Sequence, residues 1–247
     1  MDDRRSPSDA GERRGLRRVV AGSTLGLAAG VVGLALPVGL FLFASLWPGL
    51  IRVPPGDLLR VTAVLALAGS ILFALSLTLY RWGFWALQDG DRRFWAASAL
   101  CLFGTVGIVL LVLPVIIAFT QSDAMASCIQ GSPTKVLACF DSAAPVAAYV
   151  ALAGFWLLWI GGLGIVVGIG LVSVRYRESY LAVGAGLYAL LLLGLLPPVL
   201  GLVFPLETTV YSIFALPVLV LLAPAVIAYG SHLSFGMTDD APAPSPG

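Results

Sequence analysis

The sequence predicts an all-α fold: a polytopic membrane bundle of six transmembrane helices with both termini in the cytoplasm. Three observations lead to this prediction. The 247-residue chain is 59% hydrophobic and 11% charged, whereas soluble domains carry about 25% charged residues. Six apolar runs have the roughly 20 residues that a helix needs to cross a bilayer. All 13 acidic and 14 basic residues (Lys and Arg) lie between these runs or at their edges, so lipid is the expected surrounding of the runs.

Each apolar run is expected to be a helix, because backbone groups without hydrogen bonds cost several kcal/mol in hydrocarbon. A membrane β-barrel would need strands of about ten residues that alternate between apolar and polar side chains, and these runs are apolar on every side. The first run is too long for the 7–15 residues of a signal-peptide core, so an uncleaved helix is expected. The six predicted spans are residues 19–46, 61–80, 96–119, 146–174, 180–203 and 210–229.

The predicted bundle, residues 19–235, lies between two polar ends. Residues 1–18 form a basic cytoplasmic segment, which serves to set the topology or, alternatively, lies as a short surface helix on anionic lipid. Residues 236–247 form a disordered, Pro-rich cytoplasmic tail. The links at residues 175–179 and 204–209 are so short that the fourth and fifth helices, and the fifth and sixth, are expected to be antiparallel neighbours.

Arginine and lysine predict the orientation, because they are enriched in cytoplasmic loops. The N-terminal segment and the second and fourth loops hold eleven of these residues, against three on the opposite side, Arg52, Arg60 and Lys135. Aromatic residues that anchor at membrane interfaces gather at the ends of the runs: Trp47, Tyr80, Trp82, Trp85, Trp95, Tyr211 and Tyr229. The predicted location is therefore the cell membrane, as an integral multi-pass protein.

Two cysteines, Cys128 and Cys139, lie in the long outer loop with ten residues between them. Thiols outside the cytoplasm meet oxidising conditions, so we expect a structural disulfide worth roughly 3 kcal/mol. The alternative is a redox pair, but such pairs usually come as Cys-x-x-Cys. Cys101, inside the third run, is interpreted as a small packing residue.

Glycines at four-residue spacing predict close helix packing. Gly22, Gly26 and Gly30 follow one face of the first helix, and Gly164 and Gly168 do so in the fourth. Small residues at this spacing let two backbones approach closely. Packing within the bundle is the favoured interpretation, and a homo-oligomer interface is the alternative.

Prolines mark expected bends in the spans. Pro197 and Pro198, flanked by Gly194 and Gly201, make the fifth helix the best candidate for a broken helix of the kind that lines transporter sites. A plain kink is the alternative, because proline is common in membrane helices. Prolines also occur in other runs, at Pro37, Pro114, Pro217 and Pro224.

Missing residue types narrow the function. No acidic residue, lysine, arginine or histidine lies inside a run, and the single histidine, His232, follows the last one. We therefore expect no enzyme activity, no metal site, no cofactor and no nucleic-acid partner. The favoured hypothesis is an accessory or assembly subunit, or a permease-like component, with the lipid bilayer and a second copy or another membrane protein as partners. The alternative is a transporter or channel for a neutral or lipophilic solute.

Overall fold

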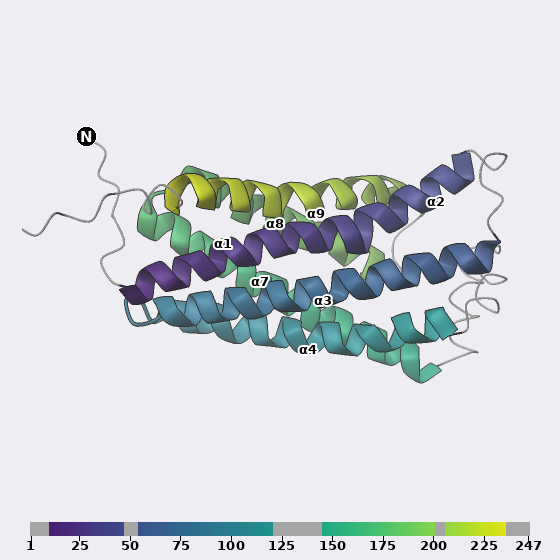
Figure 1. Ribbon diagram of the computed structural model, residues 1–247, viewed down its shortest axis with the longest axis horizontal. Helices are drawn as coiled ribbons and strands as arrows, with labels where there is room; N and C mark the ends of the chain where they lie inside the picture. The colour runs from purple at the N-terminus through teal and green to yellow at the C-terminus, as the bar shows by residue number, and fades with distance from the viewer. Residues whose placement is uncertain (1–9, 47–53, 121–144, 201–205, 236–247) are drawn as a thin grey trace, which may run out of the picture.

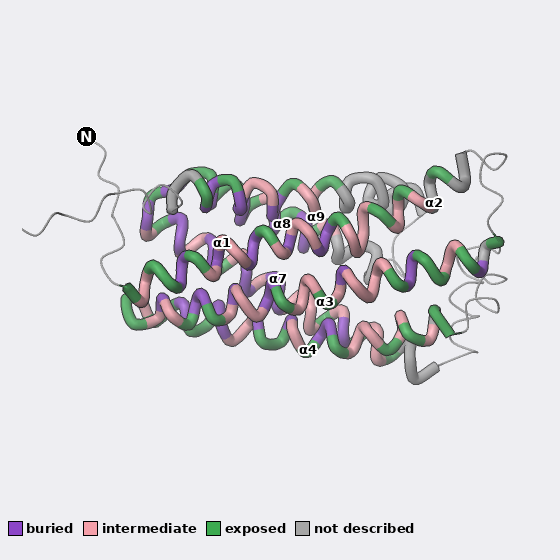
Figure 2. Tube along the Cα trace, in the orientation of Figure 1, coloured by how far each residue is buried: buried purple, intermediate pink, exposed green. Residues whose placement is uncertain are grey.

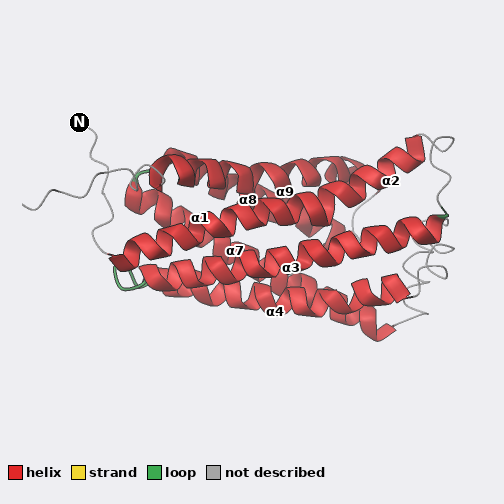
Figure 3. Cartoon of the chain, viewed as in Figure 1, coloured by secondary structure: helices red, strands yellow, loops and turns green. Residues whose placement is uncertain are grey.

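The computed structural model describes residues 10–46, 54–120, 145–200 and 206–235, which are helical apart from short turns and contain no strand (Figure 3). The helices run side by side along the long axis of the molecule (Figure 1). The predicted all-α class is therefore confirmed. In the described residues, four helices are long and apolar enough to cross a membrane, which is consistent with a membrane location: Ala10–Leu40, Gly56–Leu87, Arg93–Ile117 and Tyr149–Tyr176.

The first predicted span is one long helical segment with an irregular centre. It consists of α1 (Ala10–Gly30), the π-helical segment η1 (Val31–Ala35) and α2 (Leu36–Leu46). α1 starts inside the segment that the sequence analysis assigned to the basic N-terminus. The reason is packing, since Leu16 and Val19 are fully buried while Arg13, Arg14 and Arg17 are exposed. The helix thus begins before its apolar run, because one face of its first turns packs in the core.

The other five helical segments match the remaining predicted runs and extend most of them. They are α3 (Pro55–Leu87), α4 (Arg93–Thr120), α7 (Pro145–Tyr176), α8 (Ser179–Leu200) and α9 (Leu206–Phe235).

The turn between α7 and α8 is tight. Arg177 has a left-handed backbone with φ of 57°, and the N–H of Glu178 donates to the carbonyl of Ser173 at 3.1 Å. This bond is typical of a helix end that closes on a left-handed residue. The Ser173 hydroxyl adds a second bond, to the carbonyl of Glu178 at 2.9 Å. The turn reverses the chain, and α7 and α8 pack together as predicted.

The helices form a closed ring. Each packs against the next along the chain, α1 with α3, α3 with α4, α4 with α7, α7 with α8 and α8 with α9. The last helix, α9, also packs against α1 and so closes the ring. The predicted contact between the fifth and sixth helices, α8 and α9, is confirmed. Buried and exposed residues alternate along the helices (Figure 2), as expected when one side faces the ring interior.

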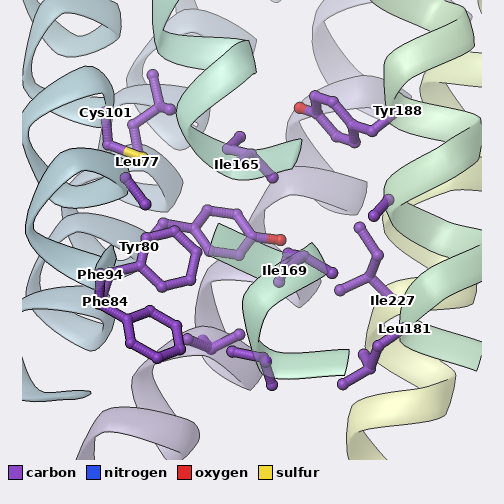
Figure 4. Close-up of a cluster of buried hydrophobic side chains, with 14 of the residues drawn as sticks. Leu77, Tyr80, Phe84, Phe94, Cys101, Ile165, Ile169, Leu181, Tyr188 and Ile227 are labelled. Atoms are coloured by element: carbon purple, nitrogen blue, oxygen red, sulfur yellow. The ribbon is translucent and has the colours of Figure 1, made fainter. Parts of the chain in front are cut away.

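A dense apolar core fills one half of the ring, toward the start of α1. Tyr80, Phe84 and Phe94 stack in a row, with ring centroids 5.8 and 6.2 Å apart. Ile165 and Ile169 of α7 lie in the middle of the core, between this row and Leu181 and Ile227 (Figure 4). All seven side chains are at most 1% exposed, so this half of the bundle is solidly packed.

Candidate functional site: a central cavity

Beyond this core the ring borders a partly open cavity of about 300 Å³, to which all six helical segments contribute. Its lining residues are Gly26, Ala29, Gly30, Gly33, Leu34, Ala66, Gly69, Ser70, Phe73, Ile108, Leu111, Phe155, Leu158, Trp159, Gly162, Tyr188, Leu191, Leu192, Val220 and Pro224. The lining is dominated by apolar side chains and glycines.

The cavity and the core occupy successive levels of the same helices. On α3 the cavity is lined up to Phe73, and the fully buried core residues begin at Leu77. On α7 the lining ends at Gly162 and the core begins at Ile165. The same order holds on α1, α4 and α8. The core therefore separates the cavity from the end of the bundle at which α1 begins.

Close glycine contacts shape the wall beside η1. A Cβ atom added to Gly33 would lie 3.0 Å from the Cα of Gly69, and the reverse substitution would be tighter still. A second crossing joins α4 and α7, where a Cβ on Gly104 would lie 2.8 Å from the Cα of Gly161. Real Cβ atoms are essentially never found below 3.0 Å from such a neighbour. Side chains at these crossings would push the helices apart and change the cavity.

The π-helical segment leaves two carbonyls without their usual helical donors. The N–H of Leu36 donates to the carbonyl of Val31, one residue further back than in an α-helix, so the carbonyl of Val32 loses that donor. Pro37 has no N–H, so the carbonyl of Gly33 receives no α-helical bond from it. Gly33 lines the cavity, which places this irregular turn at the cavity wall.

Three polar side chains line the cavity among the residues that the structure describes. The Ser70 hydroxyl donates to the carbonyl of Ala66 at 2.8 Å. The Trp159 indole N–H donates to the carbonyl of Leu192 at 2.9 Å and joins α7 to α8. Tyr188 is 6% exposed, and its hydroxyl points from α8 into the bundle (Figure 4), where it has no hydrogen-bond partner among the described residues. The lining thus offers apolar contact and one available hydroxyl, which suits a neutral molecule.

The glycines predicted to mediate packing all lie against other helices of the same chain. Gly22 and Gly26 face Ser76 of α3, and Gly30 faces Val220 of α9. Gly164 lies against the backbone of α4 at Cys101, and Gly168 lies against the ring of Phe84. All five are buried, and Gly26 and Gly30 also line the cavity. Cys101 is buried with a free thiol.

The hydroxyls of α1 and α3 strengthen this contact. Ser76 donates to the carbonyl of Gly22 at 2.6 Å. The Tyr80 hydroxyl donates to Ser23 Oγ at 2.9 Å, and Ser23 donates to the carbonyl of Val19. The glycine spacing indicates Gly22, but the bonds between the two helices cannot be read from the sequence, since they connect residues more than 50 positions apart.

Other predicted site residues are placed less fully. α8 extends as helix from Ser179 to Leu200 and includes Pro197 and Pro198, whose side chains lie outside the described part. The predicted break at these prolines stays a prediction, and the irregular turn that the structure does contain lies before Pro37. Cys128 and Cys139 are outside the described residues, and so is their predicted disulfide.

A polar cluster at the start of α1 was missed by the sequence analysis, which gave the residues before 19 no contact with the bundle. Glu12 Oε1 lies 2.8 Å from Arg175 Nη2 and accepts a short hydrogen bond from the Tyr176 hydroxyl. The Arg175 guanidinium also lies 5.9 Å from the ring centroid of Tyr176 and packs against Gly90 in the turn between α3 and α4. This cluster ties together α1, the α3–α4 turn and the end of α7.

Titratable side chains are few at the cavity among the described residues. Tyr188 is the only titratable residue in the part of the lining that the structure describes, and the described residues contain no group of three or more His, Cys, Asp or Glu placed to hold a metal ion. Comparison of the chain with protein-family models, with curated proteins and with solved structures finds no match.

Proposed function

We propose that the chain is a non-enzymatic, permease-like membrane protein that binds a neutral, largely apolar solute in the central cavity. The observation that carries the proposal is the cavity itself, about 300 Å³ within a ring of apolar helices. That volume is at the lower end of the roughly 300–1,000 Å³ of small-molecule sites, which are mostly apolar with a few placed polar groups. The hydroxyl of Tyr188 supplies such a group.

The proposal includes six membrane-crossing helices, with both termini in the cytoplasm of a cell-membrane protein. Its support is the gathering of arginines at one end. Arg175 contacts both Glu12 and Gly90, so the start of α1, the α3–α4 turn and the α7–α8 turn lie together. These segments hold most of the arginines, and such a concentration is typical of the cytoplasmic side.

An accessory or assembly role remains the second candidate, but its motivation is weaker. It rested on the absence of titratable groups inside the spans together with small-residue packing faces, and the five glycines that form these faces pack inside the chain. The cavity favours solute binding, because a purely structural subunit gains nothing from an internal space that forfeits packing contacts.

The test is binding of tritiated camphor, a neutral cyclic ketone, to the full chain in nanodiscs, with empty nanodiscs correcting for partition into lipid. We expect saturable binding that Ala66→Phe abolishes, because Ala66 lines the cavity. The matched control is Ala68→Phe, which is on the same helix but outside the lining and should bind as the unsubstituted chain does. Equal binding by both variants would show that the cavity is not the site.

Tyr188→Phe tests the polar contact. Loss of one hydrogen bond to the ketone should weaken camphor binding by about threefold to tenfold, whereas camphane, the hydrocarbon without the carbonyl, should be unaffected. A loss that is the same for both probes would mean that Tyr188 only shapes the cavity.

A further inference from the structure

A second depression lies on the outside of the bundle, between the start of α1 and the end of α3. It encloses about 400 Å³ and is lined by Arg14 and Arg18 of α1, by Trp82 and Trp85 of α3 and by Asp89 in the following turn. We call it the arginine–tryptophan groove. It is separate from the central cavity, with which it shares no lining residue.

The groove carries available positive charge. Neither Arg14 nor Arg18 forms an ion pair with an acidic residue in the described part of the chain. Arg14 Nε donates to the carbonyl of Ala10 at 3.3 Å, and the Arg18 guanidinium lies 5.7 Å from the ring centroid of Trp82, in cation–π range. Among the described residues that line the groove, one carboxylate, Asp89, stands against these two cations, so these residues carry a net positive charge.

The aromatic wall of the groove continues into an apolar stripe. Trp82 and Trp85 are 47% and 58% exposed. Val64, Ile71 and Leu75 are all more than half exposed. Val64 and Ile71 are seven residues apart, Ile71 and Leu75 are four apart, and Trp82 follows Leu75 by seven. At 3.6 residues per turn these positions share one face of α3 with Trp82. An exposed apolar stripe about as long as a lipid chain therefore leads away from the charged groove.

We propose that the arginine–tryptophan groove binds the phosphate headgroup of an anionic phospholipid, with an acyl chain along the stripe of Val64, Ile71 and Leu75. Arginine supplies donors to phosphate oxygens, and indole rings prefer the level of lipid headgroups. A soluble phosphate or an acidic peptide would use the two arginines but not the apolar stripe. Charge and apolar surface together therefore identify a lipid. This proposal is independent of the solute site.

The experiment measures retention of phosphatidylglycerol over phosphatidylcholine by the full chain, using native mass spectrometry after exchange into an equimolar mixture. We expect preferential retention of phosphatidylglycerol by the unsubstituted chain and an affinity about 30-fold weaker in Arg14→Gln/Arg18→Gln, because each arginine near an anionic lipid surface contributes to binding. The matched control, Arg13→Gln/Arg17→Gln, removes the same charge from the same turns of α1, but neither residue lines the groove. It should retain phosphatidylglycerol.

Each other outcome overturns the proposal. Equal losses in the two double variants would mean unspecific attraction by surface charge, and no loss in either would mean that the groove holds no anionic lipid. If glycerol 1-phosphate, which lacks acyl chains, displaces phosphatidylglycerol at equal concentration, the site recognises soluble phosphate instead. Thermal melting checks the fold, and if Arg14→Gln/Arg18→Gln does not fold, Arg18→Gln against Arg17→Gln decides the question.

Discussion

At the scale of single residues, glycines set how closely the helices of the ring approach. Gly33 and Gly69 meet where η1 crosses α3, and Gly104 and Gly161 meet where α4 crosses α7. In lipid, where water does not drive apolar surfaces together, close backbone approach of this kind supplies much of the attraction between helices. These four residues therefore matter for both the stability of the bundle and the shape of its cavity.

We expect Gly69→Ala to lower the melting temperature of the detergent-solubilised protein. Overpacking costs about 1–3 kcal/mol, which exceeds the gain of about 1 kcal/mol from the better helix propensity of alanine. Gly186→Ala is the control, because a Cβ there has no neighbour within 4 Å, and its melting temperature should stay equal or rise. If the melting temperatures of Gly69→Ala and Gly186→Ala changed equally, the close contact of Gly33 with Gly69 would not be what stabilises the bundle.

The sequence contained part of this residue-scale information. Spacing within one helix revealed Gly22, Gly26, Gly30, Gly164 and Gly168, because residues four apart share a helix face. The pairs of Gly33 with Gly69 and of Gly104 with Gly161 stayed hidden, since which glycines meet depends on how two helices are shifted along each other. That shift follows from the packing of many side chains.

At the scale of elements, the ion pair of Glu12 and Arg175 fastens the start of α1 to the end of α7. The two side chains are 11% and 21% exposed, so water screens the pair little. Glu12→Gln should lower the free energy of unfolding by about 2 kcal/mol, less than the about 3–5 kcal/mol of a fully buried pair. Chemical denaturation followed by circular dichroism measures this change.

The exposed pair of Asp57 and Arg60 provides the comparison. Its side chains are 52% and 44% exposed, and Asp57→Asn should cost less than about 1 kcal/mol.

The double variant Glu12→Gln/Arg175→Gln tests the coupling of the first pair. The losses of stability in the two single variants should not add in the double variant, because either substitution alone already removes the attraction between the side chains. Simple additivity would mean that the two residues stabilise the protein independently.

The positions of the helices were predictable, but their ends were not. Hydropathy located all six helical segments because it measures the preference of each run for lipid. Helix ends depend on local bonds and packing instead. α3 begins at Pro55, a residue suited to the first helical turn, and continues to Leu87, which is buried in the core. α1 begins at Ala10, before the predicted start at residue 19, because Leu16 packs inside the bundle.

At the scale of the whole molecule, the described helices form a closed ring in which each neighbours the next and α9 returns to α1. Successive helices run in opposite directions, and α9 ends at the end of the bundle where α1 begins (Figure 1). If all six cross the bilayer, a tag at either end of the chain should be unreachable by a membrane-impermeant reagent in intact cells and reachable after permeabilisation.

A tag in the segment 121–144 is the matching control and should be reachable in intact cells. Either chain end being reachable from outside would contradict the proposed orientation, and a difference between the two ends would contradict an even number of spans.

The sequence predicted neighbours at this scale only where connections were short. The contacts of α7 with α8 and of α8 with α9 followed from brief links, but the closing contact of α9 with α1 joins the two ends of the chain. The cavity was also hidden. Its lining comes from all six helical segments, and no single run of residues indicates such a space.

The π-helical segment gives the first helix a mechanical property that a regular helix would lack. Five residues of wider winding separate α1 from α2, and one additional residue in a turn rotates all later side chains by about 100°. Migration of this wider turn by a few positions would swivel the residues that it passes about the helix axis, while α1 stays anchored by Glu12 and Ser76. Because the turn borders the cavity at Gly33 and Leu34, such a swivel would exchange the side chains that a bound molecule meets without separating the helices.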